Sequence, residues 1–155
     1  MMNDEIFMKK ALDEAKLALE KGEVPIGAVI VKDGQIVATA HNLRETDRSA
    51  TAHAELLAIE KACKALGGWR LTGCELYVTL EPCPMCAGAI INSRIDRVVF
   101  GSKDEKAGAC GSVMNLFAAD FNPRPKLTVG VLEEECSAIL KSFFASLREK
   151  RKKSI

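Results

Sequence analysis

Two short motifs constrain this chain of 155 residues more than any other feature, because they carry the side chains that bind metals. The first reads HAE at residues 53–55, and the second reads PCPMC at residues 82–86. Histidine nitrogen and cysteine thiolate are the ligands that zinc prefers, and three protein ligands leave a tetrahedral zinc with one open position. His53, Cys83 and Cys86 therefore predict one zinc ion per chain, with room for a water molecule.

Glu55 completes this set as a group that can move protons. A bound zinc lowers the pKa of its water from ~15.7 toward ~7, which makes hydroxide available at neutral pH. A carboxylate close to that hydroxide can take a proton from water and deliver it to a leaving group. The four side chains together suit hydrolytic attack on an sp² carbon that bears an amine.

A C-x-x-C pair has other common uses. In an intracellular protein such a pair is often redox-active, or it is half of a structural zinc site. A structural site of four cysteines needs a second close pair, and the remaining cysteines, at positions 63, 74, 110 and 136, are scattered. A redox pair would explain neither His53 nor Glu55. Catalytic zinc is therefore favoured, and a non-catalytic zinc or redox module stays as an alternative from another class.

Length and composition are those of one soluble domain that spans residues 1–155. The first ten residues do not read as a signal peptide, and no apolar run approaches the ~20 residues needed to span a membrane. Six cysteines without an export signal suggest a reducing compartment, so we expect a cytoplasmic protein. The net charge of +1 does not by itself predict nucleic-acid binding, but five of the six residues 148–153 are basic, which exceeds what a helix end requires.

Hydrophobic periodicity and turn residues divide the chain into ten elements. Helices are predicted over residues 4–21, 51–66 (with Thr51 as the cap), 84–93, 112–119 and 132–150, and strands over residues 26–31, 35–40, 76–80, 97–101 and 127–131. Lys32-Asp33-Gly34 predicts a hairpin between the first two strands, and the later strands should be parallel through right-handed crossovers. This order indicates an α/β fold in which helices cover a mixed five-stranded sheet.

The two motifs are expected to meet at one edge of this sheet. Active sites in such folds lie beyond the carboxyl ends of the strands, and both motifs stand at a predicted helix start. Residues two apart on a helix diverge by ~200°, so His53 and Glu55 can share a site only from the first turn. Cys83 fits the N-cap, with Pro84 at the first helical position and Cys86 at the third, where the positive helix end favours thiolates.

Several longer stretches resemble one enzyme family. They are residues 24–28 (VPIGA), 41–42 (HN), 51–55 (TAHAE), 76–88 (LYVTLEPCPMCAG), 97–101 (RVVFG) and 111–116 (GSVMNL). Through them the chain is similar, nearly end to end, to the bacterial tRNA-specific adenosine deaminases of the cytidine deaminase superfamily. The zinc motifs alone are shared by deaminases of several bases. The longer stretches, with Phe143-Phe144 and the basic end, favour the tRNA enzymes.

The resemblance implies a fold, a reaction and partners. The fold would be the three-layer α/β/α cytidine deaminase-like fold, and the reaction would convert adenosine to inosine at the wobble position (34) of an arginine tRNA. Zinc would lie on His53, Cys83 and Cys86. Zinc-bound hydroxide would attack C6 of adenine while Glu55 shuttles protons. A homodimer is also implied, with the tRNA contacting both subunits.

The same resemblance assigns further residues to the substrate. Asn42 would hydrogen-bond the flipped nucleoside, and the backbone of Ala54 would read the base edge. The pocket would be lined by Ile26 and Leu80. The positions that match contacts to the anticodon loop are Asp104, Lys106, Asn122, Phe144 and Arg148. Pro123 departs from the family, which commonly has histidine there, so a stacking or hydrogen-bonding contact would be lost.

From the residues alone, some of these positions have simpler interpretations. Asn42 beside a strand end reads as a turn residue, and residues 104–106 (DEK) read as a solvated loop. Phe143 and Phe144 cannot both face the core of one helix, so we expect the first in the core and the second partly exposed. The alternative function is a deaminase of a free base or nucleoside, of the cytosine or guanine type. Such an enzyme would close its pocket with a C-terminal element, whereas an RNA enzyme would leave an open basic groove.

Overall fold

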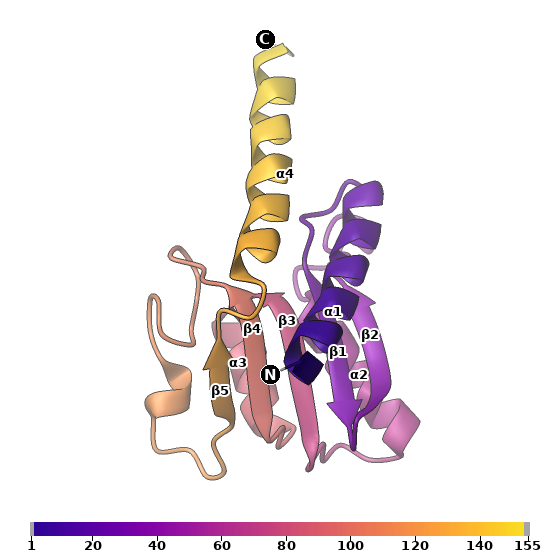
Figure 1. Ribbon diagram of the computed structural model, residues 1–155, viewed down its shortest axis with the longest axis vertical. Helices are drawn as coiled ribbons and strands as arrows, with labels where there is room; N and C mark the ends of the chain where they lie inside the picture. The colour runs from indigo at the N-terminus through magenta and orange to yellow at the C-terminus, as the bar shows by residue number, and fades with distance from the viewer. Residues whose placement is uncertain (1, 154–155) are drawn as a thin grey trace.

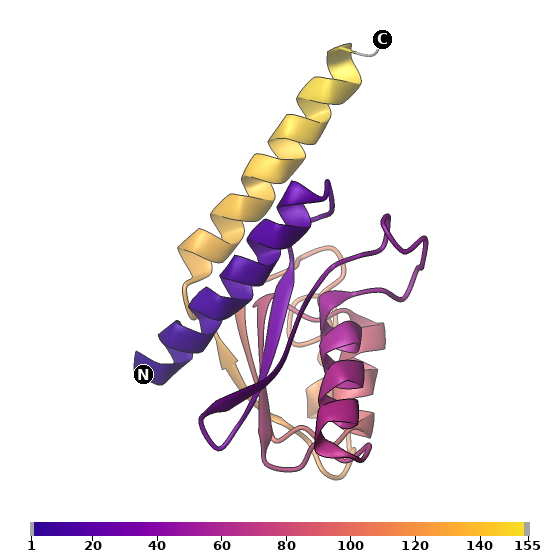
Figure 2. The same ribbon diagram turned by 90° about the vertical axis from the view of Figure 1, so that its right-hand side faces the viewer.

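A computed structural model describes residues 2–153 as three layers (Figure 1). The helices are α1 (Met2–Glu20), α2 (Ala54–Leu66), α3 (Pro84–Asn92), the 3-10 helix η1 (Leu116–Ala118) and α4 (Glu133–Lys153); the strands are β1 (Gly27–Lys32), β2 (Gln35–His41), β3 (Cys74–Leu80), β4 (Arg97–Ser102) and β5 (Lys126–Val129). The sheet is the middle layer, with α1 and α4 on one face and α2 and α3 on the other (Figure 2). The predicted α/β fold with a mixed five-stranded sheet is confirmed.

The order of the strands, β2-β1-β3-β4-β5, brings the ends of distant strands to one edge of the sheet. β1 is antiparallel to both β2 and β3, so these two strands run in the same direction, and β4 and β5 continue parallel to β3. The edge at which β2 to β5 end is called the carboxyl edge below. α2 and α3, the helices that follow β2 and β3, both begin there (Figure 1).

A two-residue turn joins β1 to β2 and sets their antiparallel pairing. Asp33 and Gly34 both have positive φ, at 50° and 75°, and Lys32 pairs with Gln35 on either side of them. Positive φ at both central residues gives a turn whose twist matches that of the strands, and Asp-Gly is a preferred pair for it. The hairpin predicted from these residues is confirmed.

Two hydrophobic clusters hold the layers together, one on each face of the sheet. The larger lies between the sheet and α2 and α3, and the smaller lies between the sheet and α1 and α4. The smaller one depends on a close approach of α1 to the start of β1, where a Cβ on Gly27 would overlap the carbonyl of Ala11. In β3, Leu76 and Val78 face the larger cluster while Tyr77 faces the smaller one, as expected for a strand buried on both sides.

α4 is longer than the part of the sheet that it covers. Its first turns bury Cys136 and Leu140, whereas the remainder projects past the carboxyl edge (Figure 1). At 1.5 Å per residue, its 21 residues span about 30 Å. Phe143 is only half-buried, so the core position expected for it is wrong, because the helix is already leaving the sheet there. Among the helices of residues 2–153, none combines the length and the apolar character needed to cross a membrane.

Two predicted elements differ from the structure for local reasons. The N-cap of α2 is His53 and not Thr51, whose hydroxyl pairs instead with that of Ser49 at 3.2 Å. The helix predicted over residues 112–119 shrinks to η1. Its first half forms turns, in which two successive backbone N–H groups bond to the carbonyl of Gly108.

A partly buried ion-pair cluster ties α1 to the amino ends of β3 and β4, at the edge opposite the carboxyl edge. The guanidinium of Arg97 donates to the carboxylate of Asp4 at 2.6 and 3.0 Å and to that of Glu75 at 2.7 Å. The hydroxyl of Tyr77 donates to Asp4 at 2.8 Å. The hydrogen bonds from Arg97 hold the pKa of Asp4 below its usual range, although burial opposes them.

Replacement of Asp4 with asparagine is expected to destabilise the fold by about 2 kcal/mol, because hydrogen bonds to charged groups contribute roughly 1.5–3 kcal/mol. Since the folded pKa of Asp4 is depressed, its contribution is present above the ordinary carboxyl pKa and is lost as the pH falls through the folded value. Urea denaturation should therefore show a gap between wild type and Asp4→Asn that is widest at neutral pH and closes in acid. The exposed neighbour Glu5, changed to glutamine, is the matched control, and an equal loss there would contradict the assignment.

Candidate metal centre and active site

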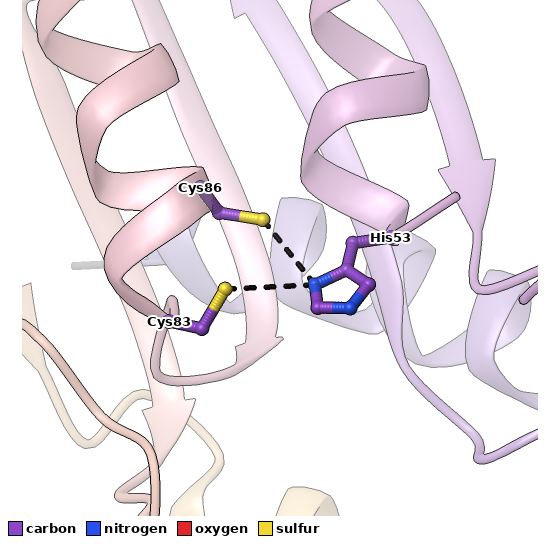
Figure 3. A group of neighbouring side chains, drawn as sticks. All are labelled: His53, Cys83 and Cys86. Carbon is purple, nitrogen blue, oxygen red and sulfur yellow. Dashed lines mark hydrogen bonds between the residues drawn. The ribbon is translucent and has the colours of Figure 1, made fainter. Parts of the chain in front are cut away.

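His53, Cys83 and Cys86 come together at the carboxyl edge (Figure 3). His53 is the N-cap of α2, and Cys83 is the N-cap of α3, with Pro84 at the first helical position. Proline has its φ fixed near the helical value and lacks an N–H, so it starts a helix without losing a hydrogen bond. Cys86 follows in the first turn of α3, and its sulfur points into the same space as that of Cys83 (Figure 3). The three side chains thus lie at the two helix starts indicated by the sequence.

The side chains of His53, Cys83 and Cys86, called the metal group below, have the spacing of ligands around one zinc ion. Nδ1 of His53 lies 3.6 Å from Sγ of Cys83 and 3.5 Å from Sγ of Cys86. With Zn–S near ~2.3 Å and Zn–N near ~2.0–2.1 Å, a tetrahedral ion would set sulfur and nitrogen about 3.6 Å apart. A single ring N–H cannot point at two sulfur atoms at once, whereas one metal ion can contact all three atoms. The donor set and its spacing therefore fit zinc, with a fourth position left for water or substrate.

The protons of this group are distributed unevenly. A hydrogen bond from Cys86, and then one with His53, lower the pKa of Cys83 to about 4 against the effect of burial. The same contact with Cys83, together with burial, raises the pKa of Cys86. The bond with Cys83 also raises the pKa of His53. These hydrogen bonds favour the thiolate form of Cys83, and a metal ion bound by the group would displace the remaining protons.

Glu55 lies beside the candidate metal ligands, in the first turn of α2. Only 4% of the residue is exposed, and this burial raises its pKa to about 7. Its carboxyl interacts with the thiol of Cys86, which places it against the metal group. A carboxyl group with such a pKa exists in both protonation states near neutral pH, as proton transfer in either direction requires.

Asn42 joins the segment before β1 to the loop after β2. Its Nδ2 donates to the carbonyl of Val24 at 3.2 Å, and its Oδ1 accepts from the N–H of Arg44 at 3.2 Å. Its own backbone N–H bonds to the carbonyl of Ile26 at 3.0 Å. The turn role suggested by the sequence is therefore present. Because an amide has two N–H donors and two acceptor lone pairs, these two side-chain bonds use one of each.

The predicted pocket residues lie on chain segments near the metal group: Ile26, Leu80 and Ala54. Ile26 enters β1 and Leu80 ends β3, and both are half-buried. A hydrogen bond from the N–H of Gly27 to the hydroxyl of Thr79, at 3.2 Å, joins these two strand ends. Ala54 is fully buried as the first residue of α2, a helix whose N-cap gives no side-chain hydrogen bond. The first N–H groups of that helix therefore need other partners.

Asp104 and Lys106 lie in the loop that follows β4 at the carboxyl edge. Leu80 pairs with Ser102, so this loop starts next to the PCPMC motif. Asp104 is half-buried, and its Oδ1 accepts from the N–H groups of Lys106 and Ala107 at 3.1 and 3.2 Å. Lys106 is exposed. The aspartate thus shapes the turn that presents the lysine.

Phe144 and Arg148 lie on the projecting part of α4. Phe144 is 41% exposed and packs edge-on against Phe143, with ring centroids 5.3 Å apart. Arg148 is exposed about one turn further along the helix. Asn122 differs from the other predicted substrate residues, because its loop enters the amino end of β5, at the opposite edge of the sheet (Figure 1). Within one chain, the structure does not bring Asn122 near the metal group.

Two buried carboxylates that the sequence analysis did not single out hold loops beside the site. Glu23 is 1% exposed and accepts from the backbone N–H groups of Glu45 and Thr46 at 3.1 and 2.6 Å. Glu81 is 2% exposed and serves the loop after β4 in the same way. Both acids come just before a proline in a largely apolar stretch, EVP and EP. An acidic residue inside such an apolar stretch is the sequence signal that could have identified these two buried carboxylates.

The family of this chain follows from its relatives. A family model described as MafB19-like deaminase matches residues 2–148. The tRNA-specific adenosine deaminase of Bacillus subtilis (strain 168) is 59% identical over 153 residues, which cover 98% of this chain and 95% of that protein. The chain belongs to the tRNA-specific adenosine deaminases. The resemblance drawn from the motifs is thereby confirmed.

Solved structures connect the fold to tRNA-specific adenosine deaminases and to more distant enzymes. A structure from a study of A-to-I editing by tRNA:A34 deaminases matches with a TM-score of 0.84 at 47% identity, covering 86% of this chain and 98% of that one. A guanine deaminase from Nitrosomonas europaea matches with a TM-score of 0.75 at 25% identity, covering 91% of this chain and 84% of that one. Since enzymes for different bases share the fold, the choice of base depends on the residues around the metal group.

The purified protein is expected to bind one zinc ion per chain, and Cys86→Ala is expected to lose it, because two remaining ligands hold a metal weakly. Elemental analysis after chelator-free purification measures the content directly. Cobalt(II) titration, followed by thiolate-to-metal absorption, counts the sites. Cys110→Ala is the matched control, since this cysteine is buried near the carbonyl of Pro82 but stands outside the ligand group. Wild-type protein without metal, or Cys86→Ala with full occupancy, would refute the site.

Proposed function

We propose that this protein is a zinc-dependent hydrolase that converts adenosine to inosine at the wobble position of an arginine tRNA. The observation that carries the proposal is the group of His53, Cys83 and Cys86 with the buried carboxyl of Glu55 beside it. Zinc, when bound there, supplies a Lewis acid that lowers the pKa of a water molecule toward ~7. The 59% identity to a tRNA-specific adenosine deaminase supports adenosine in tRNA as the substrate.

Glu55 is the proton carrier of this reaction. The oxygen of water adds to C6 of adenine, the bond from C6 to the exocyclic nitrogen breaks, and ammonia leaves, so that inosine remains. Glu55 takes a proton from the attacking water and gives one to the departing amine. Its pKa of about 7, raised by burial, suits both steps near neutral pH. Its place in the first turn of α2, two residues after His53, holds the carboxyl next to the metal group.

The residues around the metal group suit a base that is turned out of its loop. Chemistry on a base requires that the base leaves its stack and enters a pocket, where its edge is read by hydrogen bonds. Asn42 retains one donor and one acceptor for that purpose, and the N–H groups at the start of α2, including that of Ala54, offer further donors. Ile26 and Leu80 would line the pocket with apolar surface.

The part of α4 that projects past the carboxyl edge supports RNA over a free base as the substrate. It carries the exposed ring of Phe144 and, over residues 148–153, five basic residues. Stacking of a base on an aromatic ring contributes ~1–3 kcal/mol, and basic side chains neutralise phosphates. An enzyme for a free base would instead use this end to close its pocket, whereas α4 extends away from the sheet (Figure 2). Asp104 and Lys106 would meet the same anticodon loop from the loop after β4.

We further propose a homodimer in which the tRNA contacts both subunits. The loop of Asn122 enters the amino end of β5, at the edge of the sheet opposite the metal group, so Asn122 would meet the anticodon loop from a second subunit. Val113, Met114 and Phe121 are 60%, 44% and 46% exposed, and exposed apolar side chains of this size are of the kind that interfaces bury. We infer a cytoplasmic location because tRNA is decoded there.

Glu55→Ala is expected to keep zinc and fold while deamination falls by about 10⁴-fold or more. A general acid–base group typically contributes ~10²–10⁴-fold, and here one group serves both proton steps. Single-turnover rates on an anticodon stem-loop measure the loss. Glu60→Ala, an exposed acid on the same helix, is the matched control and should react normally. Near-normal activity of Glu55→Ala would show that another group carries the proton.

An anticodon stem-loop of arginine tRNA is expected to exceed free adenosine by about 10³-fold or more in kcat/KM, because binding energy from the flanking nucleotides is used to hold the target base. Ammonia release measured in parallel on the stem-loop, adenosine, guanine and cytosine tests this. Faster turnover of guanine or cytosine than of the stem-loop would establish the alternative, a deaminase of free bases.

A further inference from the structure

Glu81 stands between the metal motif and the loop that carries Asp104 and Lys106. It is the first residue after β3, two positions before Cys83, and its side chain is almost completely buried. No cation pairs with it in the described part of the chain. Its partners are four hydrogen-bond donors, and all four belong to the segment of residues 104–112.

The two oxygens of Glu81 divide these donors between the two ends of the loop. Oε1 accepts from the N–H of Asp104 at 3.1 Å and from the hydroxyl of Ser112 at 2.5 Å. Oε2 accepts from the N–H groups of Cys110 and Ser112 at 3.0 and 3.1 Å. Hydrogen bonds to an ionised acceptor are roughly twice as strong as neutral ones. The carboxylate therefore links the start of the loop, at Asp104, to its end, at Cys110 and Ser112.

The backbone of the loop is fitted closely around this carboxylate. A Cβ on Gly108 would overlap the carboxyl carbon of Glu81, so a residue without a side chain is required there. The N–H of the next residue, Ala109, bonds to the carbonyl of Pro82 at 2.9 Å, and the N–H of Glu81 bonds to the carbonyl of Ser102 at 2.8 Å. The loop and the metal motif are thus joined on both sides of Glu81.

We propose that Glu81 is a positioning residue, which fixes the loop of residues 103–112 against the metal motif so that Asp104 and Lys106 meet the anticodon loop. The path is continuous: Glu81 holds the backbone of Asp104, and the carboxylate of Asp104 holds the N–H of Lys106. The inference rests on the proposed function, because it gives this loop the task of binding RNA. Among the described residues, all side-chain hydrogen bonds of Glu81 go to the loop, so Glu81 would act through the loop.

The variant Glu81→Gln distinguishes the hydrogen bonds at one end of the loop from those at the other end. Its NH₂ group must replace one of the oxygens. At the Oε2 position it would face two backbone N–H groups, of Cys110 and Ser112, and neither can accept a hydrogen bond. At the Oε1 position it faces the hydroxyl of Ser112, which can turn round and accept, and the N–H of Asp104, which cannot. Glu81→Gln should therefore release Asp104 alone, and Glu81→Ala should release the whole loop.

The test combines amide hydrogen exchange with steady-state kinetics on an arginine tRNA stem-loop, using the zinc-loaded protein. In Glu81→Gln the amide of Asp104 should exchange about tenfold faster, while those of Cys110 and Ser112 stay protected. KM for the stem-loop should rise about tenfold, while kcat changes less than about threefold and zinc content remains one per chain. Glu81→Ala should expose all three amides and raise KM further. Ser112→Ala, which loses only the hydroxyl bond, should give a smaller rise and replaces Glu81→Gln if that variant fails to fold.

Asp4→Asn is the matched control, because it loses buried hydrogen bonds at the opposite edge of the sheet. Asp4→Asn should lower stability without changing KM. If KM rose equally in Asp4→Asn, Glu81 would have only a general stabilising role, and the proposal would be overturned. Unchanged KM and unchanged exchange of Asp104 in Glu81→Gln would also overturn it, as would a joint loss of zinc and kcat, which would assign Glu81 to the metal motif. Failure of the wild-type protein to deaminate the stem-loop would instead refute the proposed function.

Discussion

The side chains of His53, Cys83 and Cys86 can meet only because β2 and β3 run in the same direction on either side of β1. Both strands then end at the carboxyl edge, and the helices that follow them begin side by side there (Figure 3). A helix start offers unpaired N–H groups and the positive end of the helix dipole, so it favours thiolates and other anions. The metal group and Glu55 are therefore consequences of the topology, which the Asp33-Gly34 turn makes possible by reversing the chain after β1.

Buried polar side chains, more than secondary structure, order the loops around this centre. Asn42 and Glu23 hold the loop after β2 by accepting from its backbone N–H groups, and Glu81 does the same for the loop after β4. A carboxylate buried without a cation is costly unless several donors surround it. Here the backbone N–H groups of the loops supply those donors, so each loop and its carboxylate stabilise one another. The residues of both loops that we propose to contact the substrate are in this way tied to the sheet.

Elements whose signals are local could be predicted from the sequence. The hairpin and the position of Pro84 at the start of α3 depend on residues adjacent in the chain, and the structure has them as expected. The candidate metal ligands stand in two short motifs, and the fold brings these motifs together. Elements decided by distant contacts could not be predicted. Residues 112–119 have a helical pattern, but Glu81 and Gly108 draw their first half into turns. Phe143 follows an amphipathic period, yet the sheet beneath α4 ends before it.

The most direct test of this account is incubation of the zinc-loaded protein with unmodified arginine tRNA, followed by sequencing, in which inosine reads as guanosine. The account predicts complete conversion of the adenosine at the wobble position and none at other adenosines of the same molecule, because only an anticodon loop can present a splayed base to the carboxyl edge while it contacts α4 and the loop of Asp104. An unchanged wobble adenosine, or conversion spread over other unpaired adenosines, would contradict it.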